Sequence, residues 1–121
     1  MAREEFNAGQ LAQFTGTCCW FRHALNRKVL FTEGVKYLAE QAAAHWLLDE
    51  IALLQLSDGH LATEGFQVWH LNVSTDMSAE LTCEDGNSNV LYTKKIAYTD
   101  FPAEAITLWF TDNTILLPSE Y

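Results

Sequence analysis

An acidic side chain on the apolar face of a predicted helix constrains this chain more than any other feature of its sequence. Residues 33–55 have the apolar spacing of one long helix, and at about 3.6 residues per turn their apolar side chains gather on one face. Asp49 falls on that face, and His45 lies one turn earlier at its edge. Because a buried carboxylate is costly unless it is paired, we expect a basic partner to hold Asp49.

The length of 121 residues predicts a single domain, 1–121, with a helical or irregular part at 1–56 and an antiparallel sheet at 66–118. Hydrophobic residues make up 49% of the chain, which is enough to fill a core. No apolar stretch approaches the roughly 20 residues that cross a bilayer, and the charged N-terminus lacks the apolar segment of a signal peptide. We therefore expect a cytoplasmic protein.

The negative charge is concentrated in the second half of the chain. Residues 1–56 carry six acids and five Lys or Arg, whereas residues 57–121 carry ten acids and two lysines. This surplus disfavours direct binding to nucleic acid, whose phosphates need Lys and Arg. Two interpretations stay open. The charge keeps the protein soluble, or it meets a basic protein partner, including one that normally binds nucleic acid.

The sequence predicts no cofactor and no metal. Cys18, Cys19 and Cys83 are an odd number of thiols, which argues against a disulfide framework in a cytoplasmic chain. The adjacent pair Cys18 and Cys19 lacks the about two to four intervening residues of a zinc-binding pair. The sequence contains neither a phosphate-binding loop nor a serine nucleophile elbow, so nucleotide-dependent and serine-based chemistry are disfavoured.

Two further segments are expected before the long helix. Residues 3–14 have the pattern of a short amphipathic helix, and residues 18–31 that of an extended or irregular segment with a turn near Asn26. Thr32 is the expected N-cap of the long helix. The second half of that helix is apolar on nearly all sides, so we expect the rest of the fold to cover it on all sides.

About five strands are predicted after the helix, because apolar and polar residues alternate in short runs separated by turn residues. These predicted strands are residues 66–73, 79–84, 90–99, 106–111 and 115–117. Asp112 and Asn113 fit a two-residue hairpin loop, since both tolerate a positive φ. The fold class is therefore predicted as α+β, with the long central helix and the short N-terminal helix packed on an antiparallel sheet of about five strands.

A cluster of polar residues is the candidate site. His45 and Asp49 are one helical turn apart, Glu50 follows them, and Arg22 and His23 come from a neighbouring segment. Arg22, His23, His45 and Asp49 are the candidate catalytic residues of an acid–base or metal site in which Asp49 orients a histidine. The alternative is a structural ion pair between Asp49 and Arg22 or a histidine. The sequence lacks the strong metal-binding spacings that would favour a metal site.

Four residues are candidates for contact with a partner. Trp20 and Trp109 would act as anchors if they are exposed, as tryptophans often do at protein interfaces. Glu80 and Glu84 lie on the polar face of a predicted strand in the acidic half. Their carboxylates would meet basic groups of the partner.

Six short motifs are spread along the chain. They are FTGT at 14–17, RH at 22–23, FTEGVKYLAE at 31–40, WLLD at 46–49, TCEDGN at 82–87 and LLPSEY at 116–121. With these motifs the chain resembles a small bacterial family, met in genomes, plasmids and phages, that is classed as a domain of unknown function. The resemblance implies one compact domain and a link to mobile elements, but no activity. The pair Cys18-Cys19 departs from the more polar or aromatic residues expected there.

The leading hypothesis is a non-enzymatic protein that binds a protein partner through its acidic sheet half, as an accessory or inhibitor linked to mobile elements. The alternative is a small enzyme or ligand-binding domain that uses Arg22, His23, His45 and Asp49. Replacing Asp49 by Asn separates the two. Loss of activity with little loss of fold would favour the enzyme, whereas unfolding would favour a structural pair. The oligomeric state stays open.

Overall fold

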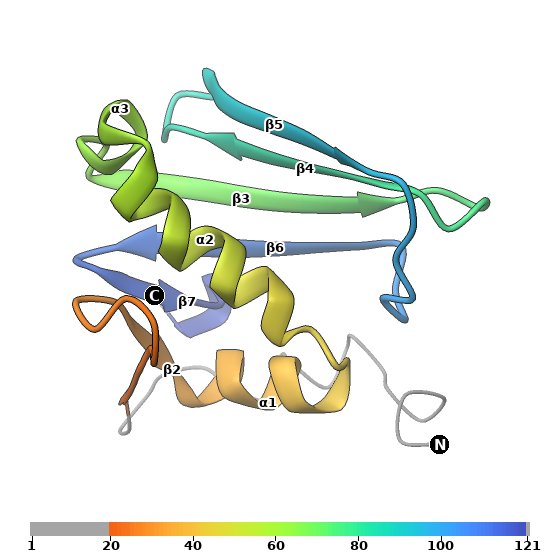
Figure 1. Ribbon diagram of the computed structural model, residues 1–121, viewed down its shortest axis with the longest axis horizontal. Coiled ribbons are helices and arrows are strands. Elements are labelled where there is room, and N and C mark those ends of the chain that lie inside the picture. The colour runs from red at the N-terminus through yellow and green to blue at the C-terminus, as the bar shows by residue number, and fades with distance from the viewer. Residues whose placement is uncertain (1–19, 121) are drawn as a thin grey trace.

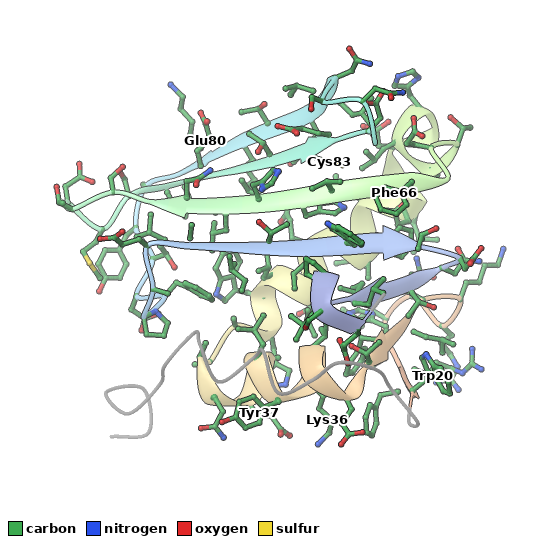
Figure 2. All side chains as sticks on the ribbon, turned by 180° about the vertical axis from the view of Figure 1, so that it is seen from behind. Trp20, Lys36, Tyr37, Phe66, Glu80 and Cys83 are labelled. Carbon is green, nitrogen blue, oxygen red and sulfur yellow. The ribbon has the colours of Figure 1, made fainter. Side chains whose placement is uncertain are left out.

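The computed structural model describes residues 20–120, which form a seven-stranded sheet and three helices, the longest of which crosses one face of the sheet (Figure 1). The opposite face of the sheet is seen in Figure 2, where the longest helix passes behind the strands and the helix that carries Lys36 and Tyr37 lies below them. The elements in chain order are β1 (Trp20–Arg22), β2 (Leu30–Thr32), α1 (Glu33–Gln41), α2 (His45–Ser57), α3 (Gly59–Ala62), β3 (Phe66–Val73), β4 (Ala79–Glu84), β5 (Val90–Ile96), β6 (Ala105–Thr111), β7 (Thr114–Leu116) and the 3₁₀ turn η3 (Pro118–Glu120). Within this described part, none of the helices has the length and apolar character needed to span a membrane.

The strands are ordered β1-β2-β7-β6-β3-β4-β5, so β1 and β5 form the two edges of the sheet. All neighbouring strands are antiparallel except β2 and β7, which run parallel. The hairpin between β6 and β7 turns at Asp112 and Asn113, which have φ values of 52° and 57°. This confirms the hairpin predicted from these two residue types.

The predicted fold class is wrong in two respects. The sheet is mixed and has seven strands rather than about five, because the segment expected to be extended or irregular contributes β1 and β2. Each of these strands has only three residues, which is too short for an alternating pattern to be recognised. In addition, the predicted long central helix is in fact two helices, α1 and α2. The predicted helix at 3–14, with Cys18 and Cys19, lies outside the described residues.

The break between α1 and α2 explains why the predicted helix phase was wrong. Three alanines separate the two helices, and the middle one, Ala43, has a positive φ of 53°. In an unbroken helix Asp49 would lie about four turns after Val35 and share its buried face. The break shifts that phase, so α2 instead buries Leu48 and Ile51.

The core lies between the helices and the sheet. Trp69 and Leu71 of β3 and Leu81 of β4 face the helices, where they are almost completely buried. They pack with the apolar sides of α1 and α2 into one cluster. The expectation that the second half of the predicted helix, which corresponds to α2, would be covered on all sides is wrong, because Leu53 is exposed.

A buried glutamine fixes α2 and α3 onto the sheet. Gln67 of β3 is fully buried, and its amide exchanges two hydrogen bonds with the amide of Gln55 on α2, at 2.9 and 3.0 Å. Its Nε2 also donates to the carbonyl of Leu61 on α3 at 2.9 Å, and its Oε1 accepts from Nε1 of Trp69 at 3.0 Å. Since a buried amide without partners is costly, these contacts specify how the helices sit on the sheet.

The C-terminal turn η3 closes over the start of α1. Thr32 is the N-cap of α1, as predicted, and its hydroxyl accepts the N–H of Val35 at 3.3 Å. The same hydroxyl donates to Oε1 of Glu120 at 2.6 Å, and that carboxylate also accepts the N–H of Gly34 at 3.2 Å. A Cβ at Gly34 would lie 2.7 Å from the side chain of Leu117, so the close approach requires glycine.

Candidate functional site

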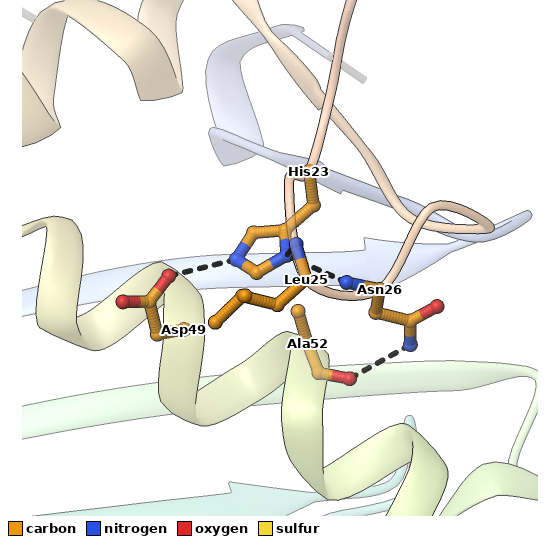
Figure 3. A network of polar contacts seen from close by, with 5 residues as sticks. All are labelled: His23, Leu25, Asn26, Asp49 and Ala52. Carbon is orange, nitrogen blue, oxygen red and sulfur yellow. Dashed lines mark hydrogen bonds and ion pairs between the residues drawn. The ribbon is translucent and has the colours of Figure 1, made fainter.

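The predicted polar cluster comes together only in part. His23 lies buried in the loop between β1 and β2, and its Nε2 is 2.8 Å from Oδ1 of Asp49 on α2 (Figure 3). Nδ1 of the same ring accepts the backbone N–H groups of Leu25 and Asn26, at 3.2 and 3.1 Å. Because Nδ1 acts as an acceptor, we assign the ring proton to Nε2, and His23 donates to Asp49. The predicted contact between Asp49 and a histidine is confirmed.

Asp49 itself is not buried, which corrects the expectation drawn from the helix pattern. Its side chain is 49% exposed, whereas the side chain of His23 is 5% exposed. The carboxylate therefore lies at the margin of α2 with water on one side. The group that requires a partner is the buried imidazole, because a buried N–H without an acceptor is costly.

Asn26 makes a second connection between the loop and α2. Its Nδ2 donates to the carbonyl of Ala52 at 2.8 Å, and its Oδ1 accepts the N–H of Lys28 at 3.2 Å (Figure 3). The sequence placed Asn26 at a turn, which is correct, but gave no sign of its contact with α2. His23 and Asn26 together hold the loop against the helix.

This geometry favours a structural role for the pair of His23 and Asp49. Both ring nitrogens of His23 are engaged, so neither has a lone pair for a substrate proton or a metal. Arg22 is exposed and donates to the carbonyl of Arg27, while His45 is exposed at the start of α2. Neither makes a hydrogen bond or ion pair with Asp49 among the described residues. Within residues 20–120, no group of three His, Cys, Asp or Glu is placed to hold a metal ion.

Glu50 connects α2 to the edge strand β5 instead of joining the cluster. Its carboxylate accepts from Nζ of Lys94 at 3.1 Å and from the hydroxyl of Tyr92 at 3.2 Å. Burial, together with the charge of Glu50, raises the pKa of Tyr92. Cys83 is buried on β4, and burial raises the pKa of its thiol to about 12, so it is unreactive as a nucleophile.

Three surface hollows meet at the end of the sheet where β3 terminates at Val73, which we call the Val73 end. Their volumes are about 520, 950 and 600 Å³. The first is lined by Trp46 and Tyr98, and it shares Asp100 with the second and Lys95 with the third. The hollows thus form a continuous uneven surface around the segment that follows β5.

Two loops form the rim of this surface. Met77 has a φ of 70°, and its carbonyl accepts the N–H of Thr99 at 2.8 Å, which joins the loop before β4 to the loop after β5. A bulky residue in this conformation is costly, and such positions cluster at functional sites. Met77 and Tyr98 are both exposed. The Val73 end therefore presents two large side chains on a backbone fixed by hydrogen bonds.

The acids of the sheet half gather at both ends of the strands. The Val73 end carries Asp76, Glu80, Asp100 and Glu104, and the opposite end, which we call the Phe66 end, carries Asp58, Glu64, Asp85 and Asp112. Both lysines of this half lie on β5, where Lys94 binds Glu50 and Lys95 is paired in register with Glu80. In residues 20–120, no ion pair joins Asp76, Glu80 or Glu104 to a cation.

The four predicted partner-binding residues lie apart from one another. Trp20 is exposed on β1, at the other side of the view from Glu80 of β4 in Figure 2. Trp109 is partly buried and packs edge-to-face on Phe66, with 5.2 Å between the ring centroids. Glu84 lies 3.7 Å from Nε2 of His70. Only Glu80 belongs to the Val73 end.

These features define a small domain with helices on one face of a mixed sheet and acids at both sheet ends. The chain belongs to the Family of unknown function (DUF6876), whose model matches residues 5–121. This confirms the predicted resemblance to a domain of unknown function. No curated protein and no solved structure is similar enough to this chain to count as a match.

Proposed function

We propose that this chain is a non-enzymatic protein-interaction domain that binds a basic protein partner through the Val73 end of its sheet. The supporting observation is that three hollows, two exposed large side chains and several acids coincide there. The hollows and the side chains of Met77 and Tyr98 offer shape and apolar area to a partner. The carboxylates of Asp76, Glu80 and Glu104 select for positive charge.

The surplus of acids also affects how fast a basic partner associates, because it attracts the partner before contact. With ten acids and two lysines in residues 57–121, the sheet half attracts a basic surface and accelerates association. Salt screens such forces over roughly 8–10 Å at physiological ionic strength, so affinity should fall as salt rises. A partner that normally binds nucleic acid fits this chemistry, since its phosphate-binding surface carries Lys and Arg.

We further infer a role as an accessory or inhibitor protein linked to mobile elements and acting in the cytoplasm. The resemblance to a family met in plasmids and phages supports the link to mobile elements. The odd number of cysteines supports a reducing compartment. The alternative of a small enzyme or ligand-binding domain has less support, because His23 and Asp49 bond to each other and to no other candidate residue among those described.

The experiment compares two variants that each remove three negative charges. The Val73-end variant carries Asp76→Asn, Glu80→Gln and Glu104→Gln. The Phe66-end variant carries Glu64→Gln, Asp85→Asn and Asp112→Asn. Full-length protein is used to purify its partner from bacterial extract, and the partner is then titrated against each variant. We expect the Val73-end variant to lose the partner and the Phe66-end variant to keep it. Equal binding by both variants would refute the proposed site, provided that circular dichroism shows both to be folded.

A further inference from the structure

A second surface lies where the loop between β1 and β2 meets α2. Three leucines are exposed there: Leu25 at 62%, Leu53 at 39% and Leu56 at 63%. Leu53 and Leu56 lie on the side of α2 that carries Asp49, because residues three and four apart share a helix face. Figure 3 shows Leu25 beside α2, close to Asp49 and Ala52. We call these three leucines the leucine patch.

The end of β1 and the loop that follows it carry a concentration of positive charge. Arg22, Arg27 and Lys28 are exposed, and they are three of the seven Lys and Arg in the chain. Arg22 donates to the carbonyl of Arg27, and none of the three forms an ion pair within residues 20–120. Lys28 and Leu56 line one hollow of about 330 Å³, with Glu64 and Asp112 also in its lining. The leucine patch therefore borders three cations in a chain of net charge −9.

The buried polar contacts hold this surface in shape. His23 bonds to Asp49 and Asn26 bonds to Ala52, at 2.8 Å each, and Leu25 lies between these two residues of the loop. The loop is thus fixed at two points along α2, which holds Leu25 near Asp49 and Ala52. His23 and Asp49 act here as positioning residues.

We propose that the leucine patch and its three cations bind an acidic segment of a partner protein that carries apolar anchor residues. The leucines offer apolar contact, and the guanidinium groups of Arg22 and Arg27 can bind carboxylates with two parallel hydrogen bonds. The patch is too small for a stable dimer, which buries about 800 Å² on each partner, because it consists of three leucines that are partly covered already. This surface is separate from the Val73 end.

The test uses a synthetic helical peptide with leucines at helical spacing and glutamates elsewhere, and a second peptide with lysines in place of the glutamates. Binding is measured by fluorescence anisotropy. We expect the glutamate peptide to bind the wild-type chain, and the pairs Leu53→Gln with Leu56→Gln, and Arg27→Gln with Lys28→Gln, each to weaken it about tenfold or more. The matched controls on β5, Val90→Gln and Lys95→Gln, should bind as the wild type does, since Val90 is 60% exposed and Lys95 is exposed.

Substitution of Asp49 distinguishes two effects of this residue on peptide binding: its hydrogen bond, which positions the loop, and its negative charge. Asp49→Ala removes a negative charge, so electrostatics alone predicts tighter binding of the glutamate peptide. The proposal predicts weaker binding, because the loop loses its bond to α2, and it predicts that Asp49→Asn keeps wild-type affinity or better. Tighter binding by Asp49→Ala would refute the positioning role.

Four other results would overturn the proposal. The first two are absence of binding and equal affinity for the lysine peptide. The third is a mass in sedimentation equilibrium that rises with concentration for the wild type but not for the Leu53→Gln, Leu56→Gln variant, which would assign the patch to a second copy of the chain. The fourth is binding to phosphatidylserine vesicles without binding to the glutamate peptide, which would assign it to a membrane.

Discussion

Removal of the Asp49 carboxylate should destabilise the protein only modestly. Asp49→Ala leaves Nε2–H of His23 without its acceptor, and an unsatisfied buried donor costs about 1–3 kcal/mol. The side chain of Asp49 is 49% exposed, so water can enter the vacated position and reduce the cost. We therefore expect the free energy of unfolding to fall by about 1 kcal/mol. Removal of one partner of a fully buried pair would cost about 3–5 kcal/mol.

Substitution of the other partner, His23, should lower the free energy of unfolding by more. His23→Ala removes a buried ring and also leaves the backbone N–H groups of Leu25 and Asn26 without their acceptor. At about 1 kcal/mol for each lost hydrogen bond plus the lost apolar burial, we expect a decrease of about 3 kcal/mol. Asp49→Asn is the control, because its amide oxygen can still accept from Nε2, and it should lie within about 0.5 kcal/mol of the wild type.

Urea unfolding followed by tryptophan fluorescence measures these three differences. Nitrogen-15 spectra of His23 check the protonation state and should show the proton on Nε2. Equal losses for Asp49→Ala and His23→Ala, or a proton on Nδ1, would refute the proposed hydrogen-bond arrangement. If Asp49→Asn kept the fold but abolished a measured activity, the enzyme alternative would replace the structural role.

Three further predictions follow from single residues. Gly34→Ala should lower the free energy of unfolding by about 1–3 kcal/mol, because the new Cβ would lie 2.7 Å from the side chain of Leu117. Thermal unfolding measures this loss, and an unchanged midpoint temperature would contradict the prediction. Cys83 is tested in a chain whose other two cysteines are replaced by serine. Its thiol should react with a thiol reagent at about pH 8 only as fast as the protein unfolds, because the thiol is buried and burial raises its pKa to about 12. The hydrogen bond from the Asn89 side chain, followed by backbone hydrogen bonds, holds the pKa of Asp85 below 3.8, so its stabilising contribution is present above that pH and is lost as the pH falls through the folded-state pKa. Asp85→Asn should therefore flatten the acid side of the stability curve measured by urea unfolding, and an unchanged curve would count against this cause.

The parts of the fold that could be predicted from the sequence are those set by local pattern. The strands β3 and β4 follow a clear alternation, the turn at Asp112 and Asn113 follows from residues that tolerate a positive φ, and the cap at Thr32 follows from its hydroxyl. The break at Ala43 could not be predicted in this way. Alanine is the strongest helix former, so local propensity favours a continuous helix here and tertiary context overrides it. The parallel pairing of β2 with β7 likewise joins segments far apart in the sequence, and no local sequence pattern indicates it.

The candidate site was predicted only in part. The sequence led us to expect Arg22 or a histidine as the partner of Asp49, and the partner is His23, but the burial on which that expectation rested is wrong, because the helix break leaves Asp49 half exposed. The contact of Asn26 with α2 had no sequence signal, because the partner is a backbone carbonyl. The strained backbone at Met77 could not be predicted either, since the residue type does not favour it. The exposure of Leu53 contradicts the apolar character of residues 46–54, which is typical of a buried helix.

The central claim is that carboxylates at the Val73 end bind a basic protein. Its most direct test is the dissociation constant of the purified complex, measured by calorimetry over a series of salt concentrations for the wild type and for the Val73-end variant. We predict that the wild-type constant rises steeply with salt, and that the variant binds more weakly at low salt with a shallower dependence. An affinity that does not change with salt, or a slope that the three substitutions leave unchanged, would contradict the claim.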